Sequence, residues 1–262
     1  MEKESDGMEG KTRTSDVLVL EPEVLFEDND VLVVNKPAGL IVHFDGRNEE
    51  PSLVDWIQKK YPETEGVGED WLSSQGVSVP RPGIVHRLDK TTSGVMVIAK
   101  NQKTFEYLKK QFQDRTTTKI YDALVYGQPK EDEGVIEAEI GRTKKKPRKW
   151  IATFAHGKTR AAITNWKVLG RYTDAESGEK VSHMELEPKT GRTHQIRVHL
   201  KAIHHPIVCD HLYSAHKECI LGFKRPALHA RSLTLELPSG EERVFESELP
   251  EDFKNAFGKI SP

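Results

Sequence analysis

The sequence predicts an α+β protein whose single domain is built on a largely antiparallel or mixed sheet with flanking helices. Short β-branched and aromatic stretches outnumber the stretches with helical periodicity, and strands do not alternate regularly with helices as in a parallel fold. The 262 residues suffice for one large domain that buries a core without staples. We assign residues 16–262 to this domain and residues 1–15, which lack apolar periodicity, to a disordered tail.

The strands are predicted from short apolar runs that end at glycine- and proline-containing turns. Tyr121, Ala123 and Val125, for example, alternate along a run that stops at residues 127–129, Gly-Gln-Pro. In chain order the predicted strands are 17–20, 24–26, 30–34, 95–99, 121–125, 135–140, 161–169, 181–186, 229–237 and 244–245.

Three helices are predicted where apolar residues recur at helical spacing. Ser52 caps the first, residues 102–114 form the second, and Thr193 caps the third, which Pro206 ends. Their apolar faces are, in that order, Leu53, Trp56 and Ile57; Phe105, Leu108 and Phe112; and Ile196, Leu200 and Ile203. Residues 61–83 are rich in Gly, Pro, Ser and Glu and are predicted to form a long surface loop.

Composition excludes several classes of protein. Two cysteines in 262 residues do not make a disulfide-built scaffold and favour a reducing compartment, so we expect a cytoplasmic location. The N-terminal residues are too polar for a secretory signal, and no apolar run approaches the roughly 20 residues that span a bilayer. The formal net charge of -2 argues against a protein that binds nucleic acid over its whole surface.

The charge is, however, unevenly distributed. Residues 141–171 hold ten Lys or Arg and no acidic residue, whereas the rest of the chain carries a net charge of -12. This asymmetry is typical of a basic patch on an acidic body, although a short basic run can also be a solvated loop. The densest part of the run is Lys144, Lys145, Lys146, Arg148 and Lys149.

The first candidate site is the polar turn at residues 86–94, which joins two apolar stretches. Asp89 lies between Arg87 and Lys90, and neighbouring cations favour the ionised carboxylate that a nucleophile or a base requires. The alternative is an Asx-turn, in which Asp89 only caps the backbone of Thr91 or Thr92.

The second candidate site lies at the start of the third predicted helix. His194, Arg197 and Lys201 share one helical face, and such a face suits phosphate or carboxylate partners. A solvated helix face is the alternative.

A histidine-rich stretch, residues 199–219, also contains both cysteines. Zinc sites have paired ligands at short spacing, whereas Cys209 and Cys219 are ten residues apart. We therefore expect no metal, and a zinc-dependent hydrolase is kept only as a rival hypothesis.

Five ordered motifs together resemble the RluA family of pseudouridine synthases, from about Phe26 to Phe245. They are Lys36-Pro37-Ala38-Gly39 with Val42-His43; His86-Arg87-Leu88-Asp89 with Thr92-Ser93-Gly94; residues 119–127; residues 188–199, PKTGRTHQIRVH; and Leu228-His229-Ala230. The resemblance implies the pseudouridine synthase fold with a central RNA-binding cleft. It also implies isomerisation of uridine in ribosomal RNA or tRNA without a cofactor. The sequence has neither GxGxxG nor a P-loop.

The resemblance also implies roles for individual residues. Asp89 is the catalytic aspartate, Tyr121 stacks on the uracil and can accept the C5 proton, and Arg197 forms the salt bridge to Asp89. The choice of Arg197 over Arg192 rests on the motif alone. Base flipping and RNA contact are assigned to Arg87, which enters the RNA stack, to Leu228, which packs against the base, and to Arg192.

The sequence departs from the family pattern at two places. About 25 residues precede the first motif, too few for the S4-type RNA-binding module of many members, so residues 141–171 are the candidate RNA grip. Cys209 stands where the family usually has glycine. We expect a monomer, and a non-catalytic RNA-binding protein that retains the fold is the rival hypothesis.

Overall fold

Eleven strands of the computed structural model form one mixed sheet, whose main path runs β1-β2-β5-β11-β6-β10-β9-β7-β8. The structure describes residues 20–44, 50–72, 76, 78–142, 149–152 and 159–261. The strands are β1 Glu23–Glu27, β2 Val31–Lys36, β5 Ser93–Ala99, β6 Thr118–Tyr126, β7 Glu133–Arg142, β8 Trp150–Ala152, β9 Arg160–Asp174, β10 Lys180–Pro188 and β11 Leu228–Glu236. β12 Glu242–Glu246 pairs with β11, β13 Ile260–Ser261 pairs with β9, and β3 Trp71–Leu72 and β4 Ser78–Val79 form a separate hairpin.

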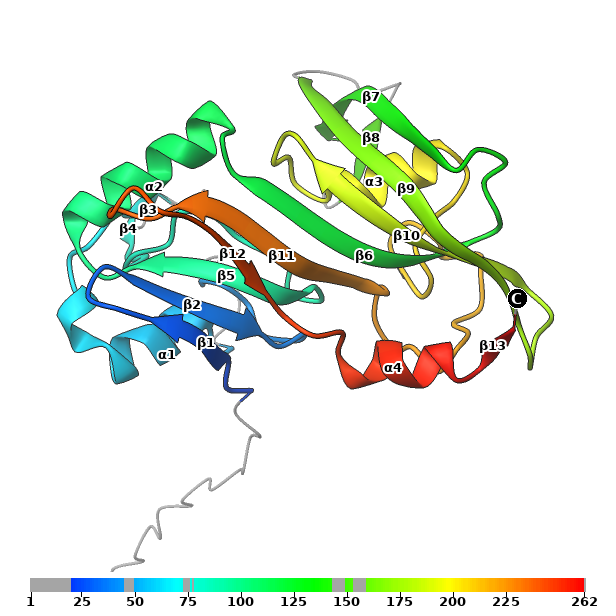
Figure 1. Cartoon of the computed structure of the whole chain (residues 1–262), viewed down its shortest axis with the longest axis horizontal. Helices are drawn as coiled ribbons and strands as arrows, with labels where there is room; N and C mark the ends of the chain where they lie inside the picture. The colour runs from blue at the N-terminus through cyan, green and yellow to red at the C-terminus, as the bar shows by residue number, and fades with distance from the viewer. Residues whose placement is uncertain are drawn as a thin grey trace, which may run out of the picture.

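The helices are α1 Leu53–Lys60, α2 Gln102–Asp114, α3 Gln195–Ala202 and α4 Glu251–Phe257, with the 3-10 turn η1 Pro62–Thr64. In Figure 1, α1 and α2 belong to the half of the molecule that holds β2 and β5, while α3 and α4 belong to the other half. No described helix has the length and apolar character needed to cross a membrane.

The first half of the sheet is covered on both faces, which explains why β2 and β5 are continuously apolar. Leu32 and Val34 of β2 pack with α1, whereas Val31 and Val33 point to the opposite face and pack with Leu108 of α2. Ser52 caps α1 through a reciprocal capping box with Asp55, as the sequence predicts for the cap.

The second half has its core between β6, β10, α3 and α4. Ile196 and Leu200 of α3 and Phe253 of α4 are buried in one cluster with Leu124 of β6 and Met184 of β10. Strand β6 pairs with β11 on one side and with β10 on the other, so it connects the two halves (Figure 1).

The predicted fold class is confirmed. Among the described strands, β5 and β11 are the one parallel pair in an otherwise antiparallel sheet. The helix at 102–114 has the predicted bounds, and the predicted strands from 24–26 onward each overlap an observed one. The predicted tail, 1–15, and all but Leu20 of the predicted strand 17–20 lie outside the described residues.

Two local predictions are wrong, and one helix is missing from the prediction. Thr193 does not cap α3; the helix starts one residue later, after His194 in a left-handed conformation (φ 55°) with no side-chain cap. Residues 61–83 are not simply a loop, because they contain η1, β3 and β4. Helix α4 was not predicted at all: its seven residues are too few for apolar periodicity to be recognised, and Pro250 precedes it.

Candidate active site

Asp89 lies in the loop that precedes β5, and a close approach of two strands places that loop beside β11. Gly94 of β5 pairs with Ala230 of β11, and a Cβ on Gly94 would meet the Ala230 carbonyl oxygen at 2.1 Å. Gly94 also has φ 121°, a conformation that other residues rarely adopt. Glycine is therefore required here for the Asp89 loop to reach the Leu228 end of β11.

Arg197 of α3 holds the Asp89 carboxylate. Its Nη1 donates to Oδ2 of Asp89 at 3.1 Å, and its Nε and Nη2 donate to the two carboxylate oxygens of Asp210 at 2.7 and 2.8 Å. Burial by itself lowers the pKa of the Arg197 guanidinium, but the hydrogen bonds and charges of Asp210 and Asp89 outweigh it and raise that pKa. The guanidinium is therefore always charged and is oriented by Asp210 towards Asp89.

The third helix does not present Arg197 to solvent. The side chain is 9% exposed, so the alternative of a solvated helix face is wrong at this position. Arg192, the other candidate partner of Asp89, instead donates from Nε to the Ala161 carbonyl at 3.2 Å. Asp210 was missed by the sequence analysis, because a single aspartate in an irregular loop has no periodicity to mark it.

A cleft of about 530 Å³ opens at Asp89 and Arg197. Tyr121 of β6 and Leu228 at the start of β11 line it, together with Arg87 and Arg192. Burial and the nearby Asp89 charge raise the pKa of the Tyr121 phenol, so the hydroxyl is protonated at neutral pH. The structure thus brings six of the predicted site residues to one cleft.

The basic run is only partly visible. Lys144, Lys145, Lys146 and Arg148 lie outside the described residues. Lys149 is described, and its Nζ lies 5.8 Å from the centre of the Tyr213 ring.

Cations that the sequence analysis did not single out line the cleft as well. Eight Lys or Arg but only two acidic residues are among its described lining residues. Burial lowers the pKa of Lys119, and the positive charge of Arg115 lowers it further; Arg192 is affected in the same way by burial, Arg160 and Arg115. Mutual repulsion of this kind favours binding of an anionic partner.

Two further cations, Lys36 and Arg225, fix the Asp89 loop. Lys36, completely buried, donates from Nζ to the carbonyls of Leu40 and Pro37 at 2.9 Å and of Lys90 at 3.4 Å. Burial lowers its pKa to about 7, although the Asp89 charge opposes this shift. The backbone N–H of Gly39 reaches the same Lys90 carbonyl at 2.7 Å.

Arg225 fixes the other side of the loop. Its Nη1 donates to the carbonyls of Thr91 at 3.2 Å and Leu228 at 3.0 Å, while Asp252 of α4 binds its Nε and Nη2. The guanidinium therefore ties the chain after Asp89 to the start of β11. Arg225 lies in an irregular segment between α3 and β11, where no sequence pattern marks it.

His86 supports the loop as a neutral hydrogen-bond acceptor. Its Nε2 accepts from the Val97 N–H of β5 at 3.0 Å, and its ring stacks on Phe112 of α2. Burial lowers the pKa of His86 to about 3. The Val97 N–H thus stays paired at neutral pH.

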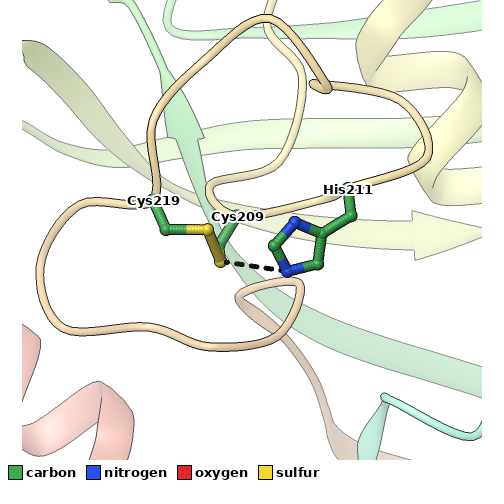
Figure 2. A group of neighbouring side chains, drawn as sticks. All are labelled: Cys209, His211 and Cys219. Carbon is green, nitrogen blue, oxygen red and sulfur yellow. Dashed lines mark hydrogen bonds between the residues drawn. A yellow bond between two sulfur atoms is a disulfide. The ribbon is translucent and has the colours of Figure 1, made fainter.

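One group of described residues has the side chains of a metal site. The sulfurs of Cys209 and Cys219 and an imidazole nitrogen of His211 lie within 4.8 Å of one another (Figure 2). The two sulfurs are joined in a disulfide, so neither is free as a thiolate. This pairing was not foreseen from the sequence, although one disulfide does not make a disulfide-built scaffold.

Comparison with known proteins identifies the class that the fold and this site define. The family model for RNA pseudouridylate synthase matches residues 30–202. The solved structures of human RNA Pseudouridylate Synthase Domain Containing 1 and 4 superpose with TM-scores of 0.67 and 0.68. They are 28% and 26% identical, cover 88% and 92% of this chain, and are themselves covered to 85% and 94%.

Curated relatives agree with this result. An uncharacterized RNA pseudouridine synthase of Bacillus subtilis is 39% identical over 88% of this chain and 70% of its own length. Ribosomal large subunit pseudouridine synthase D of Pseudomonas aeruginosa is 36% identical over 89% of this chain and 70% of its own length. The chain therefore belongs to the RNA pseudouridylate synthase family and is an isomerase of the RluA type.

The neutral state of His86 predicts a measurable loss of stability in acid. The folded pKa of about 3 lies below the ordinary 6.5, so the contribution of His86 is complete above pH 6.5 and is lost as the pH falls towards 3. His86→Gln keeps an acceptor for the Val97 N–H but does not titrate. Urea unfolding between pH 6 and 4.5 should show a pH slope about 1.4 kcal/mol per pH unit smaller in His86→Gln than in wild type. Equal slopes would contradict the assignment of a neutral, buried His86.

Proposed function

We propose that this enzyme converts specific uridines of large-subunit ribosomal RNA to pseudouridine, with Asp89 as the catalytic residue. The observation that carries the proposal is the Asp89 carboxylate, held by Arg197 at a cation-lined cleft that also contains Tyr121. Relatives named for the ribosomal large subunit, at 36% and 40% identity, support ribosomal RNA as the substrate.

Asp89 starts the reaction at the ribose of the target nucleotide. It either attacks the sugar as a nucleophile or removes a proton from it, and either route breaks the bond between N1 of the uracil and C1′. The uracil turns within the site and is joined again to C1′ through C5. In the first route the bond between Asp89 and C1′ breaks in this step, and in the second the abstracted proton returns to the sugar. The C5 proton then leaves, and N1 takes up a proton. Arg197 stabilises the negative charge of Asp89 and fixes the orientation of the carboxylate.

Tyr121 stacks on the uracil and serves as the proton acceptor at C5. Its raised pKa means that the phenol is protonated before the reaction. The hydroxyl oxygen must therefore pass its own proton on as it accepts the one from C5.

The target base has to leave the RNA stack to reach Asp89. Arg87 is exposed at the edge of the cleft and can enter the RNA in its place, while the buried Leu228 packs against the flipped base. The RNA phosphates bind to Arg192 and to the neighbouring lysines and arginines of the cleft. They also bind to the basic run at Lys144, Lys145, Lys146, Arg148 and Lys149.

We further propose that the enzyme acts as a monomer in the cytoplasm. Asp89, Tyr121, Arg197 and Leu228, to which the reaction is assigned, all come from this one chain, so the proposed mechanism needs no residue of a second copy, and two relatives are named for the ribosomal large subunit. Carbodiimide mapping of pseudouridines in RNA from cells with and without the gene tests the substrate. A site that disappears from large-subunit ribosomal RNA supports the proposal, whereas disappearance from tRNA alone contradicts it.

Asp89→Asn should abolish turnover, because an amide cannot act as the nucleophile or base, while Arg197 keeps its two bonds to Asp210. Release of tritium from RNA labelled at uridine C5 should fall by at least about 10³-fold, which is within the effect of losing a catalytic group. RNA affinity and the unfolding midpoint should remain close to wild type. A near wild-type rate would refute the mechanism and leave the non-catalytic RNA-binding protein as the better description.

Tyr121→Phe removes the hydroxyl but keeps the ring. Turnover in the tritium assay should fall by about 10²-fold or more because the proton acceptor is lost, while RNA binding should change little. Tyr121→Leu is the matched control: it removes both functions and should weaken RNA binding as well. An unchanged rate in Tyr121→Phe would exclude the proton-acceptor role.

If the cations of the cleft and of residues 144–149 bind RNA phosphates, RNA affinity should fall as the salt concentration rises. Replacing Arg115 and Arg192 with Ala, or the five basic residues at 144–149, should weaken RNA binding and reduce the slope of log K against log salt by about 0.7 for each phosphate that is no longer neutralised. Lys59 and Lys60 of α1 are exposed and do not line the cleft. Replacing both with Ala is therefore the charge-matched control for the double replacement of Arg115 and Arg192. An unchanged slope for the run at 144–149 would make it a solvated loop.

A further inference from the structure

We propose that Cys209 and Cys219 are a reversible thiol–disulfide site that controls the position of Arg197 and hence the activity of the enzyme. The inference rests on the proposed function, because Arg197 acts there through Asp89. It follows from three features of the molecule: what the loop between the cysteines holds, how Cys209 is placed, and how accessible each sulfur is.

The loop closed by the disulfide carries two side chains that hold Arg197. Asp210 follows Cys209 directly and binds Nε and Nη2 of the guanidinium at 2.7 and 2.8 Å. The Tyr213 ring centre lies 5.1 Å from the same guanidinium, and its hydroxyl lies 2.9 Å from Nδ1 of His194. Both of these contacts to Arg197 therefore come from the segment between the two cysteines.

The backbone at Cys209 is held in an unusual conformation. Its φ is 57°, in the left-handed region where glycine is favoured and a residue with a side chain is uncommon. Strained positions of this kind cluster at functional sites. The backbone N–H of Cys209 donates to the Tyr126 hydroxyl at 3.3 Å, and that hydroxyl donates to the Glu218 carbonyl.

Tyr126 thus contacts both ends of the loop from β6. With the disulfide reduced, these hydrogen bonds would remain, but the covalent link that restricts residues 210–218 would be broken. Greater freedom of the loop loosens Asp210, and Asp210 positions Arg197.

The two sulfurs differ in access, and this defines the direction of exchange. Cys219 is exposed, whereas Cys209 is 1% exposed and its sulfur lies 3.8 Å from Nε2 of the exposed His211 (Figure 2). A small-molecule dithiol can therefore attack the Cys219 sulfur, and the departing electron pair goes to Cys209. His211 is placed to donate a hydrogen bond to the Cys209 thiolate.

The exchange is balanced within the dithiol. Its first thiolate forms a mixed disulfide with Cys219 as the Cys209–Cys219 bond breaks, and its second thiolate then displaces Cys219. The dithiol becomes a cyclic disulfide, and the protein gains two electrons and two protons as two thiols. A small-molecule disulfide carries out the reverse reaction.

The test compares the oxidised and the dithiothreitol-reduced full chain, with the two states verified by alkylation and mass measurement. We expect the reduced chain to release tritium from 5-labelled uridine RNA at least about threefold more slowly, with unchanged RNA affinity, and reoxidation to restore the rate. Cys219→Ser should have the reduced rate under both conditions. His216→Ser, an exposed change in the same loop that leaves both cysteines, should retain the redox response.

Equal rates in the two verified states would overturn the proposal. So would a slow rate that appears only when the reduced chain is treated with a chelator, because a metal and not the disulfide would then control the loop. Hydrogen exchange at Leu212 and Tyr213, whose N–H groups both donate to Asp210 at 3.1 Å, provides a readout independent of activity. If neither state forms pseudouridine, the proposed function fails. Faster hydrogen exchange at Leu212 and Tyr213 on reduction would still show that the disulfide controls the loop. Unchanged hydrogen exchange would overturn control of the loop as well.

Discussion

The site depends on the hydrogen-bonded ion pairs that the buried Arg197 guanidinium forms with Asp210 and Asp89. A charged group taken out of water costs several kcal/mol unless its partners are well placed. Asp210 meets this requirement by binding two of the guanidinium nitrogens, and the planar fork then leaves Nη1 directed at Asp89. Asp210 itself is completely buried and accepts the N–H groups of Leu212 and Tyr213. The position of the Asp89 carboxylate is therefore determined by a loop more than one hundred residues away in the sequence.

The Asp89 loop is supported from its other side by cations that bind carbonyls and not carboxylates. Lys36 binds the carbonyl directly after Asp89, and Arg225 binds that of Thr91. Burial of the Lys36 ammonium costs free energy, as its lowered pKa shows. An apolar side chain in its place would avoid that cost but could not bind the loop carbonyls. Together these contacts hold a short irregular segment on rigid strands, which leaves the carboxylate little freedom to turn away from the cleft.

Sequence reasoning predicted what local patterns encode. The strands at β2 and β5, the helix Gln102–Asp114 and the turn with Asp89 all have apolar runs or dense polar motifs that mark them. Asp210 and Arg225 are single charged residues in irregular segments, and only the tertiary structure brings them to the site. The choice between Arg192 and Arg197 rested on the motif alone, and only the tertiary structure shows that Arg197 is buried against Asp89 while Arg192 bonds the Ala161 carbonyl.

The charged residues of the cleft, too, are brought together only by the tertiary structure. A net charge of -2 conceals a cleft whose described lining has eight basic and two acidic residues. All eight of these cations lie outside the basic run at 141–171. Arg115, Lys119 and Lys189 come together because α2, β6 and the end of β10 meet at the cleft. Attraction for anions is thus concentrated around the Asp89 carboxylate, while an acidic remainder disfavours binding elsewhere. Mutual repulsion among these cations destabilises the cleft when it is empty, and an anionic partner that binds there relieves that repulsion.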